Sequence, residues 1–180
     1  MLARGFAKRA VLVDADEDAC ALAEENAREN GVDARVARGD VLDVARALRG
    51  QAGAIVCNPP YFEEGSGRAR AHGASARIGD VDRFVRATRE LLGRSARAHF
   101  VYPAHNLARL FRSFRDAGLE PKRLRFVHAT PAAAARVALV TASASKPGGL
   151  VVDAPLIERA GPKHADYSDE MRAILGIAAR

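Results

Sequence analysis

The sequence has few cysteines, no tryptophan and no long apolar run. Only two cysteines, Cys20 and Cys57, occur in 180 residues, which argues against a disulfide framework or a cysteine-based metal site. No apolar stretch approaches the roughly 20 residues of a membrane-spanning helix, and the N-terminus has no signal-peptide core before its charges. The five histidines lack the spacing of metal ligands. We therefore expect a cytoplasmic protein with no bound metal.

The composition is that of an ordinary globular protein. Hydrophobic residues make up 48% of the chain and charged residues 28%, and a chain of this length can bury a proper core. Neither an internal repeat nor a linker divides it. We therefore expect residues 1–180 to form one domain. Cys57 could be a nucleophile, but a small buried apolar residue is the favoured interpretation.

Short apolar runs alternate with helical patterns. Residues 10–13 and 54–57 are typical of buried strands. Helical spacing and capping residues predict helices from Asp16 to Gly31, from Asp80 to Gly93 and from Leu107 to Gly118. This alternation predicts an α/β fold. The remaining elements that we expect are the tail of a helix in residues 2–9, a short helix or irregular crossover in 42–50, and strands at 35–37, 98–102, 124–128 and 137–141.

The strand that ends at Cys57 is followed by Asn58-Pro59-Pro60-Tyr61-Phe62. Two prolines cannot continue a ladder, so the chain leaves the sheet at the edge where doubly wound folds bind ligands. The Asn58 side-chain oxygen and the Pro59 carbonyl can accept hydrogen bonds from an exocyclic amino group, and Tyr61 can stack on a base. Alternatively, the motif is a proline-rich turn that caps the strand, with Tyr61 covering the core.

Two further acidic residues follow predicted strands. Asp14 ends an apolar strand before a helix, where nucleotide-binding α/β folds hold ribose hydroxyls. Asp14 is favoured over Asp16, since Asp16 is expected to cap the helix. Asp40 and Val41 follow Gly39 after the strand at 35–37. Both acids have an alternative interpretation: Asp14 only begins a turn, and Gly-Asp is a common turn sequence.

Positive charge is concentrated in the middle of the chain. Residues 68–125 carry 14 Lys and Arg against 5 Asp and Glu, a local balance of +9 in a chain whose net charge is +6. Clustered arginine indicates a surface for phosphate backbones. An arginine-rich composition that reflects GC-rich coding is the alternative.

Asn58-Pro59-Pro60-Tyr61 after a strand resembles the signature of S-adenosylmethionine-dependent methyltransferases that act on adenine N6 or on glutamine amides. Together with residues 119–128, 155–157 and 167–176, it makes the chain similar to the bacterial tRNA1(Val) (adenine-N6)-methyltransferase family over essentially its whole length. The resemblance implies a Rossmann-like class I methyltransferase sheet, mostly parallel with an antiparallel C-terminal strand. It also implies S-adenosyl-L-methionine as cofactor and tRNA as substrate.

The resemblance assigns roles to individual residues. The target amine would be held by Asn58, Pro59, Pro60 and Tyr61. The cofactor would be bound by Asp14, Asp40, Val41 and Asn58, with Asp40 taking the amino group of its adenine. Apart from the resemblance, the glycine-containing loop after the motif suggests nucleic-acid contacts by Phe62, Arg68, Arg70 and Arg77, although Arg68 and Arg70 could equally be solvated. Glutamine-modifying relatives usually carry a smaller aliphatic residue where this chain has Phe62.

The sequence departs from the class I pattern at its start. The family begins with a strand and a Gly-x-Gly loop, and nothing before Met1-Leu2 supplies them. We therefore expect an N-terminally truncated sheet, without the strand between those that end at Asp14 and Asn58. These two strands would pair directly, or a second chain would fill the gap, as in a homodimer. Other candidate functions are methylation of protein glutamine, ribosomal RNA or DNA, and an inactive domain that binds RNA or a partner chain.

Overall fold

The computed structural model of the chain describes residues 2–60, 80–161 and 166–177. Strands and helices alternate in its first third, after a 3-10 helix at Leu2–Arg4. Asp16 caps the first α-helix and Asp40 the second, each by accepting a backbone N–H. The elements are β1 (Arg9–Asp14), α1 (Glu17–Glu29), β2 (Asp33–Arg38), α2 (Val41–Ala47) and β3 (Ala52–Cys57).

The rest of the chain is richer in strands. Asp80 caps α3 and Ser168 caps α5, again by accepting backbone N–H groups. The elements are α3 (Val81–Leu91), β4 (Leu92–Pro103), α4 (Leu107–Asp116), β5 (Glu120–His128), β6 (Ala135–Ser143), β7 (Val151–Val152), β8 (Leu156–Ile157) and α5 (Asp169–Leu175), with a 3-10 helix at Ala104–Asn106 before α4.

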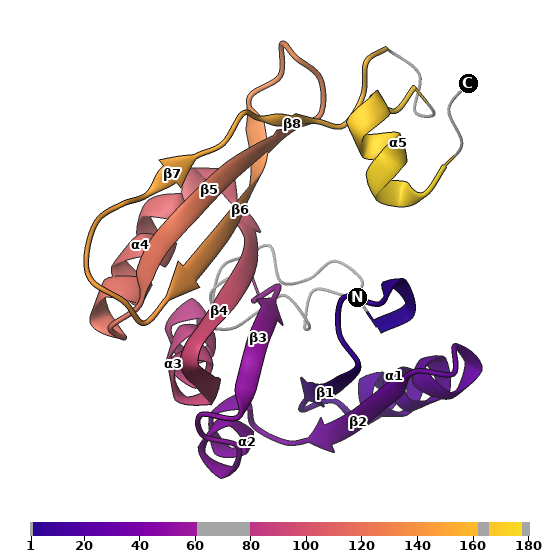
Figure 1. The fold of residues 1–180 in the computed structure, drawn as a ribbon, viewed down its shortest axis with the longest axis vertical. Helices are drawn as coiled ribbons and strands as arrows, with labels where there is room; N and C mark the ends of the chain where they lie inside the picture. The colour runs from indigo at the N-terminus through magenta and orange to yellow at the C-terminus, as the bar shows by residue number, and fades with distance from the viewer. Residues whose placement is uncertain (1, 61–79, 162–165, 178–180) are drawn as a thin grey trace, which may run out of the picture.

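The strands form two sheets (Figure 1). In the smaller sheet, β1 and β2 pair in parallel. The larger sheet has the order β3-β4-β6-β5-β7, and β8 also pairs with β5. Its strands β3 and β4 are parallel, whereas β6 runs antiparallel to both of its neighbours. The expected α/β class with an antiparallel strand near the C-terminus is thus confirmed.

No ladder joins β1 to β3: the described partner of β1 is β2, and that of β3 is β4. Of the two alternatives considered for the strands that end at Asp14 and Asn58, direct pairing with each other is therefore wrong. Figure 1 shows β1 and β2 to one side of β3, with α2 connecting β2 to β3. Because α2 packs against α3, contacts between helices place the smaller sheet beside the larger one.

The apolar core lies between the larger sheet and the helices α3 and α4. Alternate residues of β4, namely Ala98, Phe100 and Tyr102, are buried there, as expected for a strand with one face on a core. Phe114 of α4 is fully buried and meets Phe100 edge to face, with 5.0 Å between ring centroids. This core fixes β3 and β4, and with them the end of β3 at Asn58.

Two predicted boundaries are wrong. Residues 2–9 do not form the tail of an α-helix: a 3-10 helix ends at Arg4, Gly5 turns the chain with φ +72°, and β1 starts at Arg9. Gly93 does not end α3. It lies in β4, which starts six residues before the expected strand. A Cβ atom on Gly93 would stand 3.0 Å from the Gly50 carbonyl oxygen, so the close approach of the two backbone segments favours glycine here.

Within the described part of the chain, no helix has both the length and the apolar character that a membrane crossing requires.

Phe114→Ala is expected to lower the free energy of unfolding by about 3–5 kcal/mol, because it removes a fully buried ring and leaves a cavity. Urea unfolding followed by circular dichroism measures this loss. Phe6→Ala is the matched control: Phe6 is 75% exposed, so its change should stay within about 0.5 kcal/mol. A loss below about 1 kcal/mol for Phe114→Ala would contradict the assigned core.

Candidate cofactor and acceptor site

The carboxyl ends of β1 and β2 bring two aspartates to one edge. Asp14 is the last residue of β1 and is paired with Arg38, the last residue of β2. The Gly39 amide donates to the Asp14 carbonyl oxygen at 2.9 Å, which places Asp40 next to the end of β1. The side chain of Asp14 accepts the Asp16 amide at 3.0 Å. Asp14 therefore does begin a turn, as its alternative interpretation requires, and its second carboxylate oxygen makes no hydrogen bond to the described residues.

Asp40 is held from two sides. Its Oδ1 accepts the Leu42 amide at 3.0 Å, which caps α2, and its Oδ2 accepts a hydrogen bond from the guanidinium of Arg83 on α3. Partial burial favours the neutral acid, but the hydrogen bonds from Arg83 and Leu42 outweigh burial and hold the pKa of Asp40 below its usual value. The carboxylate is therefore ionised at neutral pH, and Val41 follows it as the first residue of α2.

The motif after β3 is described as far as Pro60. Asn58 is exposed, Pro59 is fully buried and Pro60 is half-buried. Because Cys57 pairs with Phe100, the motif continues beside the end of β4. The buried Pro59 fits a turn that caps the strand, and Asn58 before it is exposed to solvent. The other predicted site residues, Tyr61, Phe62, Arg68, Arg70 and Arg77, lie outside the described residues.

Sequence reasoning missed a cluster of polar side chains at the end of β4 and the start of α3. Tyr102 is 2% exposed, and burial together with the negative charges of Asp82 and Asp80 raises its pKa. The Ser113 hydroxyl donates to Asp82, and an Arg109 guanidinium nitrogen lies 3.4 Å from Asp80 Oδ1. Asp80 was recognisable as a helix cap, but its partner Arg109 lies on another helix and had no local signal.

The cysteines do not supply a reactive group. Burial raises the pKa of Cys57 to about 12, so its thiol stays protonated at neutral pH and is a poor nucleophile. Cys20 is buried under the end of β1, where its thiol lies 3.5 Å from the Asp14 carbonyl oxygen. Over the described ranges, no group of three or more His, Cys, Asp or Glu side chains is placed to hold a metal ion.

The arginines of the basic region that the structure describes, from Arg83 to Arg125, divide into two sets. Four of them, Arg83, Arg109, Arg123 and Arg125, form ion pairs within the chain. Arg125 binds both carboxylate oxygens of Glu170, at 2.6 and 2.7 Å, and so fastens α5 to β5. These four serve the fold at least in part. A second set is exposed and forms no ion pair with the described residues: Arg86, Arg89, Arg94, Arg97, Arg112 and Arg115.

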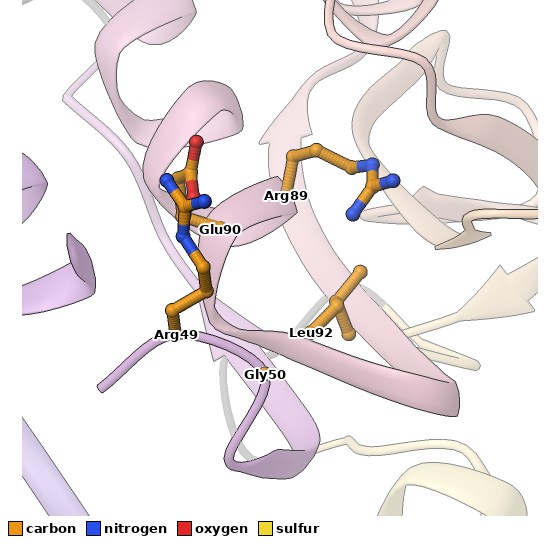
Figure 2. A pocket seen from close by; sticks show the side chains of 5 residues that line it. All are labelled: Arg49, Gly50, Arg89, Glu90 and Leu92. Carbon is orange, nitrogen blue, oxygen red and sulfur yellow. The ribbon is translucent and has the colours of Figure 1, made fainter. Parts of the chain in front are cut away.

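The pocket in Figure 2 lies at the edge of the larger sheet opposite the motif at Asn58. Gly50 precedes β3 and Leu92 begins β4, so the pocket is at the amino ends of these strands. Arg49 and Glu90 meet in it at 2.7 Å, while Arg89 points away from that pair. Ligands of doubly wound folds bind at the carboxyl ends of strands, so this pocket does not belong to the candidate site.

Residues 1–109 match the methyltransferase small domain family. The chain belongs to this family. It is an S-adenosylmethionine-dependent methyltransferase with the class I fold, and S-adenosylmethionine is its cofactor.

Solved structures agree with the fold. A predicted O-methyltransferase, protein Atu636 from Agrobacterium tumefaciens, is similar with a TM-score of 0.69 and 19% identity, over 94% of this chain and 78% of that one. A chain described as a modification subunit of a type I restriction enzyme from Vibrio vulnificus YJ016 has a TM-score of 0.51 and 11% identity, over 92% of this chain and 39% of that one. No curated protein matches the sequence closely enough to count as a relative.

The residues at the ends of β1 and β2 fit the nucleoside half of the cofactor. Ribose hydroxyls and the amino group of adenine are hydrogen-bond donors, and both need acceptors. Asp14 and Asp40 supply carboxylates at neighbouring positions of one edge, and an ionised carboxylate accepts about four hydrogen bonds through its two oxygens. Each therefore keeps acceptor capacity after its contacts within the chain.

Asp40→Asn is expected to destabilise the methyltransferase by less than about 1 kcal/mol near pH 7, because the Asp40–Arg83 pair is partly exposed. A carboxylate with a lowered folded-state pKa stabilises the protein above its unfolded pKa of about 4 and loses this effect as the pH falls through the folded pKa. Urea unfolding of both proteins from pH 7 to pH 3 should show their difference shrinking. A difference that grows as the pH falls would contradict the assigned ion pair.

Proposed function

We propose that this methyltransferase methylates the N6 amino group of an adenine in tRNA. The observation that carries the proposal is the position of Asn58-Pro59-Pro60. The motif directly follows β3, at the carboxyl end of a parallel strand, with the Asn58 side chain exposed. The ends of β1 and β2 offer acceptors for a nucleoside. The chain can thus hold a methyl donor at the carboxyl ends of β1 and β2 and an amine acceptor at the carboxyl end of β3.

In this proposal the chain orients the acceptor amine. The Asn58 side-chain oxygen and the Pro59 carbonyl accept hydrogen bonds from its two N–H groups. These contacts direct the nitrogen lone pair toward the methyl group. These acceptors also increase the electron density on nitrogen, so a strong base is not required. The cofactor supplies a methyl group on a sulfonium centre. A nitrogen–carbon bond forms as the sulfur–carbon bond breaks, and the amine then loses one proton to water.

The cofactor would be held at the neighbouring edge. We assign the ribose hydroxyls to Asp14 and the adenine amino group to Asp40, with Val41 beside the ring. Asp16 caps α1, with its Oδ1 accepting the Ala19 amide at 2.9 Å, and we assign it no contact with the cofactor. Asn58, which follows β3, would lie between the methyl donor and the target base.

A nucleic acid substrate is supported by the exposed arginines of α3, α4 and β4. Arg86 and Arg89 lie in the second half of α3, and Arg112 and Arg115 lie in the second half of α4, which contacts α3. Basic side chains on adjacent helices favour contacts with a phosphate backbone. These four residues lie toward the amino-terminal edge of the sheet, so they would hold tRNA at a distance from Asn58.

Asn58→Ala is expected to reduce methyl transfer by about 100-fold or more, because the amine loses an oriented acceptor. The assay uses S-adenosylmethionine with a labelled methyl group and separate pools of tRNA, ribosomal RNA, DNA and protein. Label should enter tRNA, and nucleoside mass spectrometry should identify N6-methyladenosine. Asn26→Ala is the matched control, since Asn26 is an exposed residue of α1.

Label in protein alone, or in DNA alone, would replace tRNA as the substrate. Undiminished transfer by Asn58→Ala would remove its assigned role. If a folded chain transfers no methyl group to any pool but still binds tRNA with a steep salt dependence, the inactive RNA-binding domain replaces the proposal.

A further inference from the structure

One ion pair connects the two halves of the candidate site. Asp40 caps α2 at the end of β2, and Arg83 is the third residue of α3, the first described helix after the motif at Asn58. The two residues are 43 positions apart in the chain. Since no backbone ladder joins the two sheets within the described residues, the contact of α2 with α3 sets their arrangement. The Asp40–Arg83 pair lies at the edge of this contact where the proposed ligands bind.

The pair fixes the orientation of the Asp40 carboxylate. Its Oδ1 is bound to the Leu42 amide at 3.0 Å, and its Oδ2 is bound to Arg83. A carboxylate that is held at both oxygens cannot turn about its side-chain bonds without breaking one of these contacts. The side chain is still 32% exposed, so a ligand can reach the lone pairs that remain.

We infer that Arg83 is a positioning residue for recognition of the cofactor's adenine. Arg83 orients the Asp40 carboxylate so that one remaining lone pair meets the amino group of adenine. This inference rests on the proposed function, since it requires that Asp40 accepts that amino group. Arg83 itself does not contact the cofactor, and its effect on binding passes through Asp40.

The contribution of the Asp40–Arg83 pair to the free energy of unfolding is smaller than its expected effect on ligand binding. The side chains of Arg83 and Asp40 are 48% and 32% exposed, and ion pairs with this exposure contribute about 0–1 kcal/mol to stability. An oriented acceptor in a binding site has a larger effect, because a misplaced partner leaves the ligand's donor unsatisfied. Loss of Arg83 should therefore change ligand binding more than it changes the free energy of unfolding.

The chain offers a matched control on α2, the helix that Asp40 caps. Arg46 of α2 pairs with Asp43 at 3.0 Å, and both side chains are more exposed than those of the Asp40–Arg83 pair. Arg46→Met removes an arginine and an ion pair without touching Asp40. Arg83→Lys retains the positive charge but loses the planar guanidinium, so it separates the effect of charge from that of orientation.

The test is a calorimetric titration with two ligands. One is S-adenosylhomocysteine, and the other is its inosine analogue, in which a carbonyl replaces the amino group of the base. The unmodified chain should prefer the adenine ligand. Arg83→Met should weaken binding of that ligand on the order of tenfold and weaken the analogue by less than about twofold. Arg83→Lys should give an intermediate preference, and Arg46→Met should leave the preference unchanged.

Three results would overturn the inference while leaving the cofactor site in place. They are equal weakening of both ligands by Arg83→Met, no weakening of either, and tighter binding of the adenine ligand. An unmodified chain that binds both ligands equally would show that Asp40 does not accept the amino group, which removes the assignment of Asp40. A folded chain that binds neither ligand would reject the proposed cofactor site, and the inference with it.

Discussion

The packing of α2 against α3 is the constraint on which the candidate site depends. In most parallel sheets, continuous ladders align the strand ends where ligands bind. Here β1 and β2 form one ladder, and β3 and β4 form another. The ends at Asp14 and Asp40 are therefore placed relative to Asn58 by contacts between helices and by the Asp40–Arg83 pair. The proposed cofactor residues Asp14 and Asp40 therefore lie beside one sheet, and the acceptor motif at Asn58 follows a strand of the other sheet.

The arginines of the chain differ in whether they form ion pairs within the described part of the fold. Arg83, Arg109 and Arg125 bind carboxylates and connect elements that are distant in sequence. The exposed arginines of α3 and α4 are available for a polyanion. Net charge alone does not separate these sets, because it counts a paired and an unpaired arginine equally. The ion-pair partners reduce the excess of positive charge that a substrate would meet, and they restrict it to particular helix faces.

The parts of the fold that local chemistry determines could be predicted from the sequence. The capping roles of Asp16 and Asp80 follow from short-range hydrogen bonds, and the strand before Asn58 follows from an apolar run ended by prolines. Gly93 misled the prediction because a glycine can end a helix or permit close packing. The position of the Gly50 carbonyl, which decides between the two, is not local.

The candidate site was predictable to a similar extent. Asp14, Asp40 and Asn58 each follow a strand, so their placement at carboxyl ends came from local patterns. The Asp40–Arg83 pair could not be predicted, because it depends on how α2 packs against α3 across 43 residues of chain. The lack of pairing between β1 and β3 is likewise a property of the whole arrangement rather than of either strand.

The central claim is that the carboxyl ends of β1 and β2 bind the nucleoside of the cofactor. The most direct measurement is a titration of S-adenosylhomocysteine into isotopically labelled protein, followed by the chemical shifts of backbone amides. Saturable shifts are expected at Gly39 and Leu42 and at the residues after Asp14, with little change in β5 and β6. Saturable shifts confined to the pocket at Arg49 and Gly50, or no saturable shifts in a folded protein, would contradict it.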